Sequence, residues 1–230
     1  MKKVAFIGSY DKADMIIYIA KILTNVGKKV LVIDSTVLQK TRYIVPTMKA
    51  QKQYITTWEK VDVAIGFENI NQIKEYKGLE NGEQLEYDFI LIDIDSYRGY
   101  CYYNIKTEDK KYFITSFDLY CLKRGLQVLK KIEQPIEVTR VLFTKEMLAE
   151  EEKFLNFLSK GLKVKWDSNI LYLPFELGDQ NAIFSNQRSG RIQLKGVSSQ
   201  YVDAIEYMAE EISGENKGAI RKAVKMIERN

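Results

Sequence analysis

Two aspartates stand where they could act together on a phosphate or a metal ion. Asp34 directly follows a strand predicted at residues 29–33, and Asp93 ends the otherwise apolar run 89–93. Short runs of this kind, rich in β-branched residues, predict buried parallel strands. Ligands of open parallel sheets bind beyond the carboxyl ends of the strands. We therefore expect the two carboxylates to converge on one crevice, where they could serve a phosphate and metal site.

The elements around these aspartates predict an α/β protein. A strand is expected at 3–7, and apolar residues at helical spacing from Met15 to Val26 predict a helix that Gly27 ends. With the strand at 29–33 they form a right-handed parallel crossover. The run 89–93 is expected at the centre of the sheet. The segment 54–67 predicts an edge strand or a hairpin.

The remainder of the chain continues the alternation of strands and helices. Further strands are predicted at 112–115, 138–143 and 170–173. Further helices are predicted at 69–76, 119–132, 148–158, 201–212 and 219–227. We expect a single domain, residues 1–230, with a mostly parallel, doubly wound sheet of about seven strands and helices on both faces.

Composition excludes several kinds of chemistry. The chain has no histidine, which removes Ser–His and Cys–His nucleophile pairs and the commonest metal ligand. Its 35 basic and 31 acidic residues give a net charge of +4, a weaker bias than dedicated nucleic-acid binders show.

Two cysteines are too few for a disulfide framework and favour a reducing compartment. No stretch approaches the roughly 20 apolar residues that cross a bilayer, and the N-terminus lacks a signal-peptide core. We expect a cytoplasmic protein that is not an integral membrane protein.

Three pieces at the predicted strand ends carry a resemblance to a known family: 8–13 (GSYDKA), 27–34 (GKKVLVID) and 87–93 (YDFILID). They resemble the ParA/MinD family of deviant-Walker P-loop ATPases, which position plasmids, division sites, pili and other cell-surface machinery. The second piece is similar to the family's second strand and acidic first switch, and the third to its Walker B strand. Segment 173–176 looks like the adenine-side loop, and 197–212 like the last core helix. The resemblance implies a P-loop NTPase-like fold with ATP and Mg²⁺ as ligands.

The resemblance also assigns roles to single residues, with Lys12 at the position of the family's phosphate lysine. It implies nucleotide binding by Gly8, Ser9, Lys12, Ala13, Pro174 and Phe175, metal binding by Asp34 and Asp93, and catalysis by Lys12, Asp34 and Asp93. The alternative for Lys12 is a solvated lysine in the first turn of the following helix.

The phosphate loop departs from the family pattern at several points. Ala13 stands where the Mg²⁺-binding Ser or Thr belongs, Asp11 replaces the glycine before the lysine, and the loop is about two residues short. An anionic Asp11 inside a phosphate nest would repel the ligand. Thr36 replaces the switch carboxylate that helps to orient the attacking water. We therefore expect weak or lost binding of ATP and Mg²⁺, and weak or lost hydrolysis.

An aromatic and basic cluster follows the Walker B-like strand. It contains Tyr97, Arg98, Tyr100 and Tyr102, in a segment expected to be a loop. In the family this region faces the dimer partner or a regulator, and Tyr and Arg dominate contact energies in interfaces. We predict an interface with a second copy or another protein. The alternative is that the tyrosines cover the flank of the sheet.

Two further features leave alternatives open. Some relatives of this fold bridge an iron–sulfur cluster or a metal between subunits, but Cys101 and Cys121 lack Cys-x-x-Cys spacing, which favours ordinary thiols. The segment 217–229 places Ile220, Val224 and Ile227 among basic residues, the pattern of a peripheral membrane anchor. Because this face has no Trp, Phe or Leu, a helix packed on the domain is favoured.

These observations favour a ParA/MinD-like spatial organiser, or an assembly or partition factor, with weak or lost nucleotide hydrolysis. The first alternative is an active Mg²⁺-dependent ATPase that uses Lys12, Asp34 and Asp93. The second is a module that binds DNA or a membrane surface through scattered lysines and the last helix.

Overall fold

A computed structural model describes residues 1–47, 51–80, 82–174 and 176–229 of the protein. Within them lie eight strands: β1 (Lys2–Ile7), β2 (Val30–Asp34), β3 (Tyr54–Trp58), β4 (Val61–Ile65), β5 (Phe89–Ile94), β6 (Lys110–Thr115), β7 (Ile136–Leu142) and β8 (Val164–Tyr172). The helices are α1 (Ala13–Asn25), α2 (Thr41–Ile44), α3 (Ile70–Tyr76), α4 (Tyr97–Tyr102), α5 (Leu119–Lys130), α6 (Ala149–Leu158), α7 (Leu177–Ser189), α8 (Ser199–Ser213) and α9 (Lys217–Arg229).

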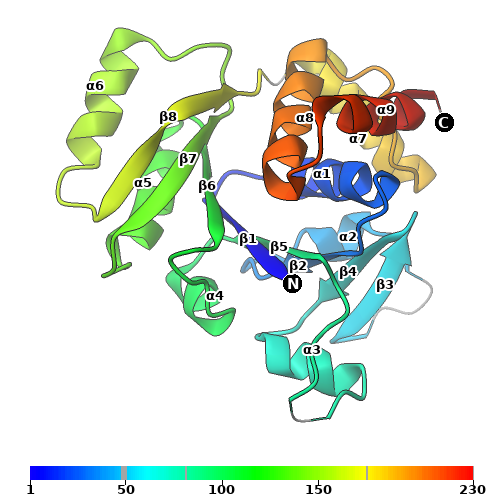
Figure 1. Ribbon diagram of the computed structural model, residues 1–230. Helices are drawn as coiled ribbons and strands as arrows, with labels where there is room; N and C mark the ends of the chain where they lie inside the picture. Colours follow the sequence, from blue (N-terminus) through cyan, green and yellow to red (C-terminus); the bar gives the residue numbers. More distant parts are fainter. Residues whose placement is uncertain (48–50, 81, 175, 230) are drawn as a thin grey trace.

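All eight strands belong to one sheet in the order β3-β4-β2-β5-β1-β6-β7-β8 (Figure 1). Only the hairpin β3–β4 is antiparallel, and every other pair is parallel. The mostly parallel sheet and the hairpin are therefore confirmed, and β5 lies near the middle as expected. The sheet has one strand more than the about seven expected.

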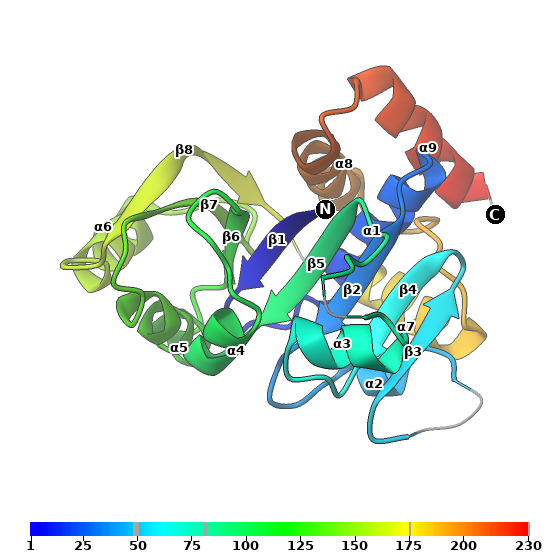
Figure 2. The same ribbon diagram turned by 60° about the horizontal axis from the view of Figure 1, so that its bottom comes forward.

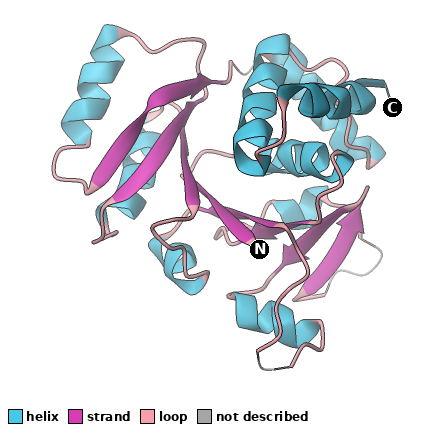
Figure 3. Ribbon diagram, viewed as in Figure 1, coloured by secondary structure: helices cyan, strands magenta, loops and turns pink. Residues whose placement is uncertain are grey.

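Helices cover both faces, which confirms the doubly wound arrangement (Figures 1 and 3). One apolar layer joins the sheet to α1, α8 and α9, and the other joins it to α3, α4 and α5. The chain leaves β1 through α1 toward β2, and it leaves β5 through α4 toward β6. Because these crossovers run to opposite sides, the carboxyl ends of β1 and β5 form the switch point where such folds bind ligands (Figure 2).

Three segments differ from the predictions for identifiable reasons. Strand β8 begins at Val164 rather than at residue 170, because Lys165, Asp167 and Ser168 interrupt the apolar pattern of this edge strand. Helix α7 was not predicted, since its few apolar residues form no clear stripe. The expected loop 97–103 is wrong: α4 forms there, and its first turn is capped by Ser96 Oγ, which accepts a hydrogen bond from the Gly99 N–H.

Candidate functional site

The carboxyl ends of β1, β2 and β5 form a small crevice. Strands β2 and β5 are in register, so that Asp34 lies directly beside Asp93. The crevice has a volume of about 150 Å³, and it is lined by residues of the loop after β1, the loop after β2 and the end of β5, among them Gly8, Ser9, Lys12, Ala13, Thr36, Lys40 and Asp93. The two aspartates are neighbours at the strand ends, as expected, but only Asp93 lines the crevice and Asp34 does not. The volume is below the about 300–1,000 Å³ of typical ligand pockets.

Lys12 is buried and turned onto its own loop. Its side chain is only 2% exposed, and Nζ lies 2.6 Å from Oδ1 of Asp93. The ammonium also donates to the backbone oxygen of Gly8 at 2.7 Å and approaches that of Tyr10 at 3.5 Å. The alternative of a solvated lysine is therefore wrong. The Lys12 ammonium is bound by groups of the protein, namely the Asp93 carboxylate and the Gly8 carbonyl.

Asp93 is a buried carboxylate with one strong counter-charge. Burial raises its pKa to about 7, with Lys12 opposing the shift and Asp34 adding to it. The Asp93 carboxyl therefore changes between its charged and its neutral form near neutral pH.

Asp34 is occupied by backbone and hydroxyl donors. Its Oδ1 accepts hydrogen bonds from the Thr36 N–H at 3.0 Å and the Thr36 hydroxyl at 2.6 Å. Its Oδ2 accepts from the N–H of Thr41, the first residue of α2, at 2.9 Å. Asp34 therefore shapes the turn after β2 and anchors α2. In the described part of the chain, no group of three or more Asp, Glu or Cys side chains is placed to hold a metal ion.

Gly8 is explained by close packing within the sheet. Its φ of +149° is a region that favours glycine, and a Cβ there would lie 1.9 Å from the backbone oxygen of Ile114 on β6. Its N–H donates to the backbone oxygen of Ile94 at 2.9 Å. This N–H is consequently used inside the fold and does not face the crevice as a phosphate donor.

The first N–H of α1 also has an internal partner. The Ala13 N–H donates to Oδ1 of Asp11 at 3.3 Å, and Oδ2 of Asp11 pairs with Lys40. An internal carboxylate thus stands at the helix N-terminus, where an anion is favoured. Asp11 was expected to repel a ligand from within the loop. It lines the crevice with an exposed side chain, and Lys40 pairs with its charge.

Lys40 and Asp14 were not anticipated as part of this site. Lys40 reaches from the loop after β2 and also lies 3.5 Å from Oδ2 of Asp14. Both oxygens of Asp14 accept from Nε2 of Gln187 on α7, at 2.9 and 3.0 Å. Burial raises the pKa of Asp14. No spacing in the sequence relates these three residues, since they come from separate elements.

Ser9 has a side-chain hydroxyl without a hydrogen-bond partner in the described residues. Its Oγ is buried. The neighbouring Tyr10 stacks on Phe143 with ring centroids 4.3 Å apart. A hydroxyl in this position is free to meet a ligand.

The predicted adenine-side segment follows β8. Pro174 is buried there, and Phe175 lies outside the described residues. Asp179, which was not predicted, fastens the segment: its Oδ2 accepts from the Glu176 N–H at 3.0 Å, and its Oδ1 accepts from the Ser198 N–H at 2.6 Å. This fully buried carboxylate ties the start of α7 to the residue before α8.

The predicted interface is only partly exposed. Arg98 and Tyr102 lie outside, with the guanidinium 4.8 Å from the ring centre, and Tyr97 is half-buried. Tyr100 is buried at 8% exposure and packs in the core beneath α4. The surface open to a partner is therefore formed by Tyr97, Arg98 and Tyr102, without Tyr100.

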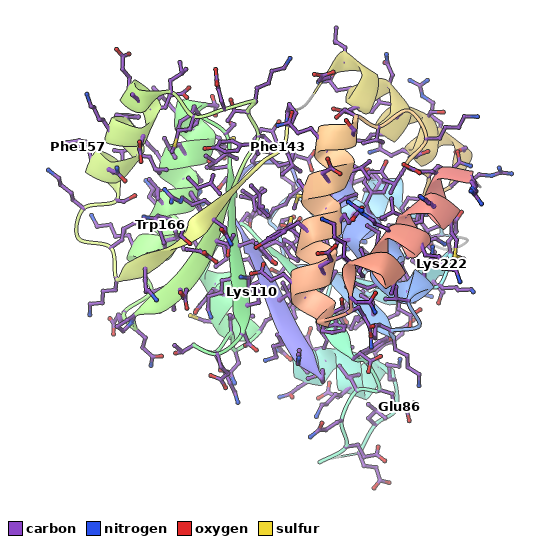
Figure 4. All side chains as sticks on the ribbon, turned by 45° about the horizontal axis from the view of Figure 1, so that its top comes forward. Glu86, Lys110, Phe143, Phe157, Trp166 and Lys222 are labelled. Carbon is purple, nitrogen blue, oxygen red and sulfur yellow. The ribbon has the colours of Figure 1, made fainter. Side chains whose placement is uncertain are left out.

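The cysteines and the last helix can also be placed. Cys101 is exposed on α4 and Cys121 is half-buried on α5, both as free thiols. The apolar side of α9 packs into the core with Ile220, Val224 and Ile227 buried, so a helix packed on the domain is confirmed. Its outer side is basic and includes Lys222 (Figure 4). No helix in the described residues is both long and apolar enough to pass through a bilayer.

Taken together, these residues do not fit a magnesium nucleotide in this conformation. The lysine, the helix N-terminus and the switch aspartate each have internal partners, and Ala13 offers no hydroxyl to a metal.

No family model and no curated protein matches the chain. Solved structures do resemble it. A chain of the MinC:MinD cell division protein complex of Aquifex aeolicus matches with a TM-score of 0.60 and 16% identity, over 94% of this chain and 97% of that one. A ParA family ATPase from Chlorobium tepidum matches with a TM-score of 0.56 and 16% identity, over 90% and 97%. The McdA–ATP complex of Cyanothece matches with a TM-score of 0.55 and 11% identity, over 94% and 97%.

Proposed function

We propose that this chain, which has the fold of the MinD, ParA and McdA ATPases, is a spatial organiser or an assembly or partition factor with weak or lost nucleotide hydrolysis. It acts by binding protein partners or a second copy of itself. Nucleotide plays a small part or none in that binding.

One observation carries the proposal: the Lys12 ammonium, at the position of the phosphate lysine, is paired with Asp93 at 2.6 Å and is almost fully buried. A phosphate chain would have to displace Asp93 and the Gly8 carbonyl from this ammonium. It would also have to displace the Asp11 carboxylate from the N-terminus of α1. Each exchange gives up an existing ion pair or charge-assisted hydrogen bond, so the net gain from the ligand is small.

Loss of Mg²⁺ binding follows from the same residues. A hydroxyl at position 13 would be a metal ligand, and alanine removes it. Asp34 has two oxygens that already accept three hydrogen bonds. Without a held metal, the charge that develops on the leaving phosphate is not stabilised.

The proposal is tested by measuring hydrolysis and assembly together. We expect ATP turnover no higher than in the Lys12→Met variant, and the same sedimentation velocity profile with and without MgATP. A turnover that is abolished in Lys12→Met under conditions where circular dichroism shows this variant to be folded, or a monomer that becomes a dimer when MgATP is added, would overturn it.

An active ATPase of the same fold is the second candidate, and the Ser9 hydroxyl favours it. This group is buried without a hydrogen bond in the described part of the chain, as expected for a residue that meets a ligand. If Lys12 separated from Asp93, the ammonium and the carboxylate would lie next to each other and could both contact a ligand. Under this candidate, Ser9→Ala lowers ATP affinity; under the leading proposal it has no effect on it.

A further inference from the structure

A second and larger cavity lies between the start of α4 and α5. Its volume is about 630 Å³, within the about 300–1,000 Å³ typical of ligand sites. Its lining includes Asp95, Tyr97, Arg98, Arg124, Lys130 and Lys131. Asp95 also lines the small crevice at Lys12, so the two spaces are neighbours.

The charges around this cavity are unbalanced. Four cations line it, against the single carboxylate of Asp95, whose Oδ2 accepts from the Val37 N–H at 3.0 Å and whose buried Oδ1 has no hydrogen bond within the described residues. Arg98 has a carboxylate partner, Glu68, only at 3.5 Å. Arg124 contacts Gln127 at 3.4 Å. In the described part of the chain, Lys130 and Lys131 have neither an ion pair nor a side-chain hydrogen bond.

The sequence of α5 creates this imbalance. The helix from Leu119 to Lys130 contains no acidic residue, so none of its cations is neutralised within the helix. Arg124, Gln127 and Lys131 recur at spacings of three and four, which places them on one side of the helix. Like charges held together around a concave surface repel one another until an anion enters.

We propose that this cavity binds a ligand with two or three linked phosphate groups. Such a chain carries about three or four negative charges in a small volume, which matches the excess of cations. The guanidinium groups of Arg98 and Arg124 suit paired phosphate oxygens, and the two lysines act as point charges. The half-exposed ring of Tyr97 offers a flat surface beside them. Free polyphosphate and the phosphate chain of a nucleotide share this chemistry.

The lining of this cavity includes no residue of the loop at Lys12. A ligand held between α4 and α5 leaves the pair of Lys12 and Asp93 closed. Variants at Arg124 and Lys131 therefore test the cavity, and variants at Lys12 test the phosphate loop, so that the two proposals can fail separately.

The test is a calorimetric titration with inorganic tripolyphosphate in the absence of Mg²⁺. We expect Arg124→Gln and Lys131→Gln each to weaken binding about tenfold or more, as removal of a charge-assisted hydrogen bond does. Lys123→Gln is the matched control, because Lys123 is exposed on the same helix but does not line the cavity. It should change the affinity less than about twofold. Parallel titrations with ATP and AMP show whether the source is a nucleotide, since ATP should then bind more tightly than tripolyphosphate.

Three results would overturn the inference. The first is no binding of tripolyphosphate or ATP at millimolar concentration. The second is an equal loss in Lys123→Gln, which would indicate diffuse attraction. The third is binding that Lys12→Met abolishes while the Arg124 and Lys131 variants bind normally. All of the α5 variants replace exposed side chains, and unchanged thermal unfolding will verify that they fold.

Discussion

Nζ of Lys12 lies 2.6 Å from Oδ1 of Asp93, with the two side chains 2% and 6% exposed. Lys12 enters from the loop after β1, and Asp93 is the last residue but one of the neighbouring strand β5. The pair therefore joins the two central elements at the switch point of the sheet. Removal of one member of a buried pair leaves a charge without compensation, whereas replacement of both by apolar groups can be nearly neutral.

We predict that Lys12→Met destabilises the protein by about 3–5 kcal/mol at pH 8, where Asp93 of the parent is ionised, because the variant must either bury an unpaired carboxylate or protonate it. The double variant Lys12→Met, Asp93→Leu should recover most of this loss, because it leaves no unpaired charge. Urea unfolding of the two single variants and the double variant gives the coupling energy. A Lys12→Met variant as stable as the parent would contradict the buried pair.

The pKa of Asp93 predicts how stability changes with pH. Its value of about 7 in the fold exceeds the ordinary 3.8, so between these values the folded state holds a proton that the unfolded state has lost. The free energy of unfolding is then highest at low pH, and it falls as pH rises toward 7, by up to about 1.4 kcal/mol per pH unit. In Asp93→Asn this dependence on pH is absent, because the asparagine side chain does not titrate. The difference in unfolding free energy between parent and variant, measured from pH 4 to 8, should follow this direction, and a constant difference would exclude it.

A third prediction concerns repair of the phosphate loop. Asp11→Gly removes the carboxylate at the Ala13 N–H and leaves Lys40 with Asp14 as its remaining carboxylate partner. Ala13→Ser restores a hydroxyl with the smallest side chain, which matters because Ala13 is only 4% exposed. Together they should strengthen MgATP binding about tenfold or more over the parent. Isothermal titration of the double variant and both single variants measures this gain. No gain would argue against Lys12 as the counterpart of a phosphate lysine.

Much of the fold could be predicted from the sequence, because apolar runs and helical spacing report burial directly. The placement of Asp34 beside Asp93 followed from two strand ends. What each aspartate contacts could not be predicted in this way. The bonds from Thr36 and Thr41 to Asp34, the contact of Lys40 with Asp11, and the fastening role of Asp179 depend on how loops from distant segments fold back. Tyr100 was misplaced because a short capped helix has no apolar period long enough to recognise.

The α4 surface gives a fourth prediction. Tyr102→Ser with Arg98→Gln should weaken self-association or partner capture and leave stability within about 0.5 kcal/mol, because both side chains are exposed. Tyr100→Ser is the contrasting variant. It empties a buried position and should cost about 3 kcal/mol or more. Sedimentation velocity reports association, and thermal unfolding reports stability. Unchanged association in the exposed double variant would remove this surface from consideration.

Calorimetric titration with MgATP tests the closed loop most directly. The internal partners of Lys12 and of the α1 N-terminus predict no sub-micromolar binding, and they predict that any weak binding is unchanged in Lys12→Met. Sub-micromolar affinity that requires Mg²⁺ and disappears in Lys12→Met would contradict the account, because it would show that the loop opens and uses this lysine for phosphate.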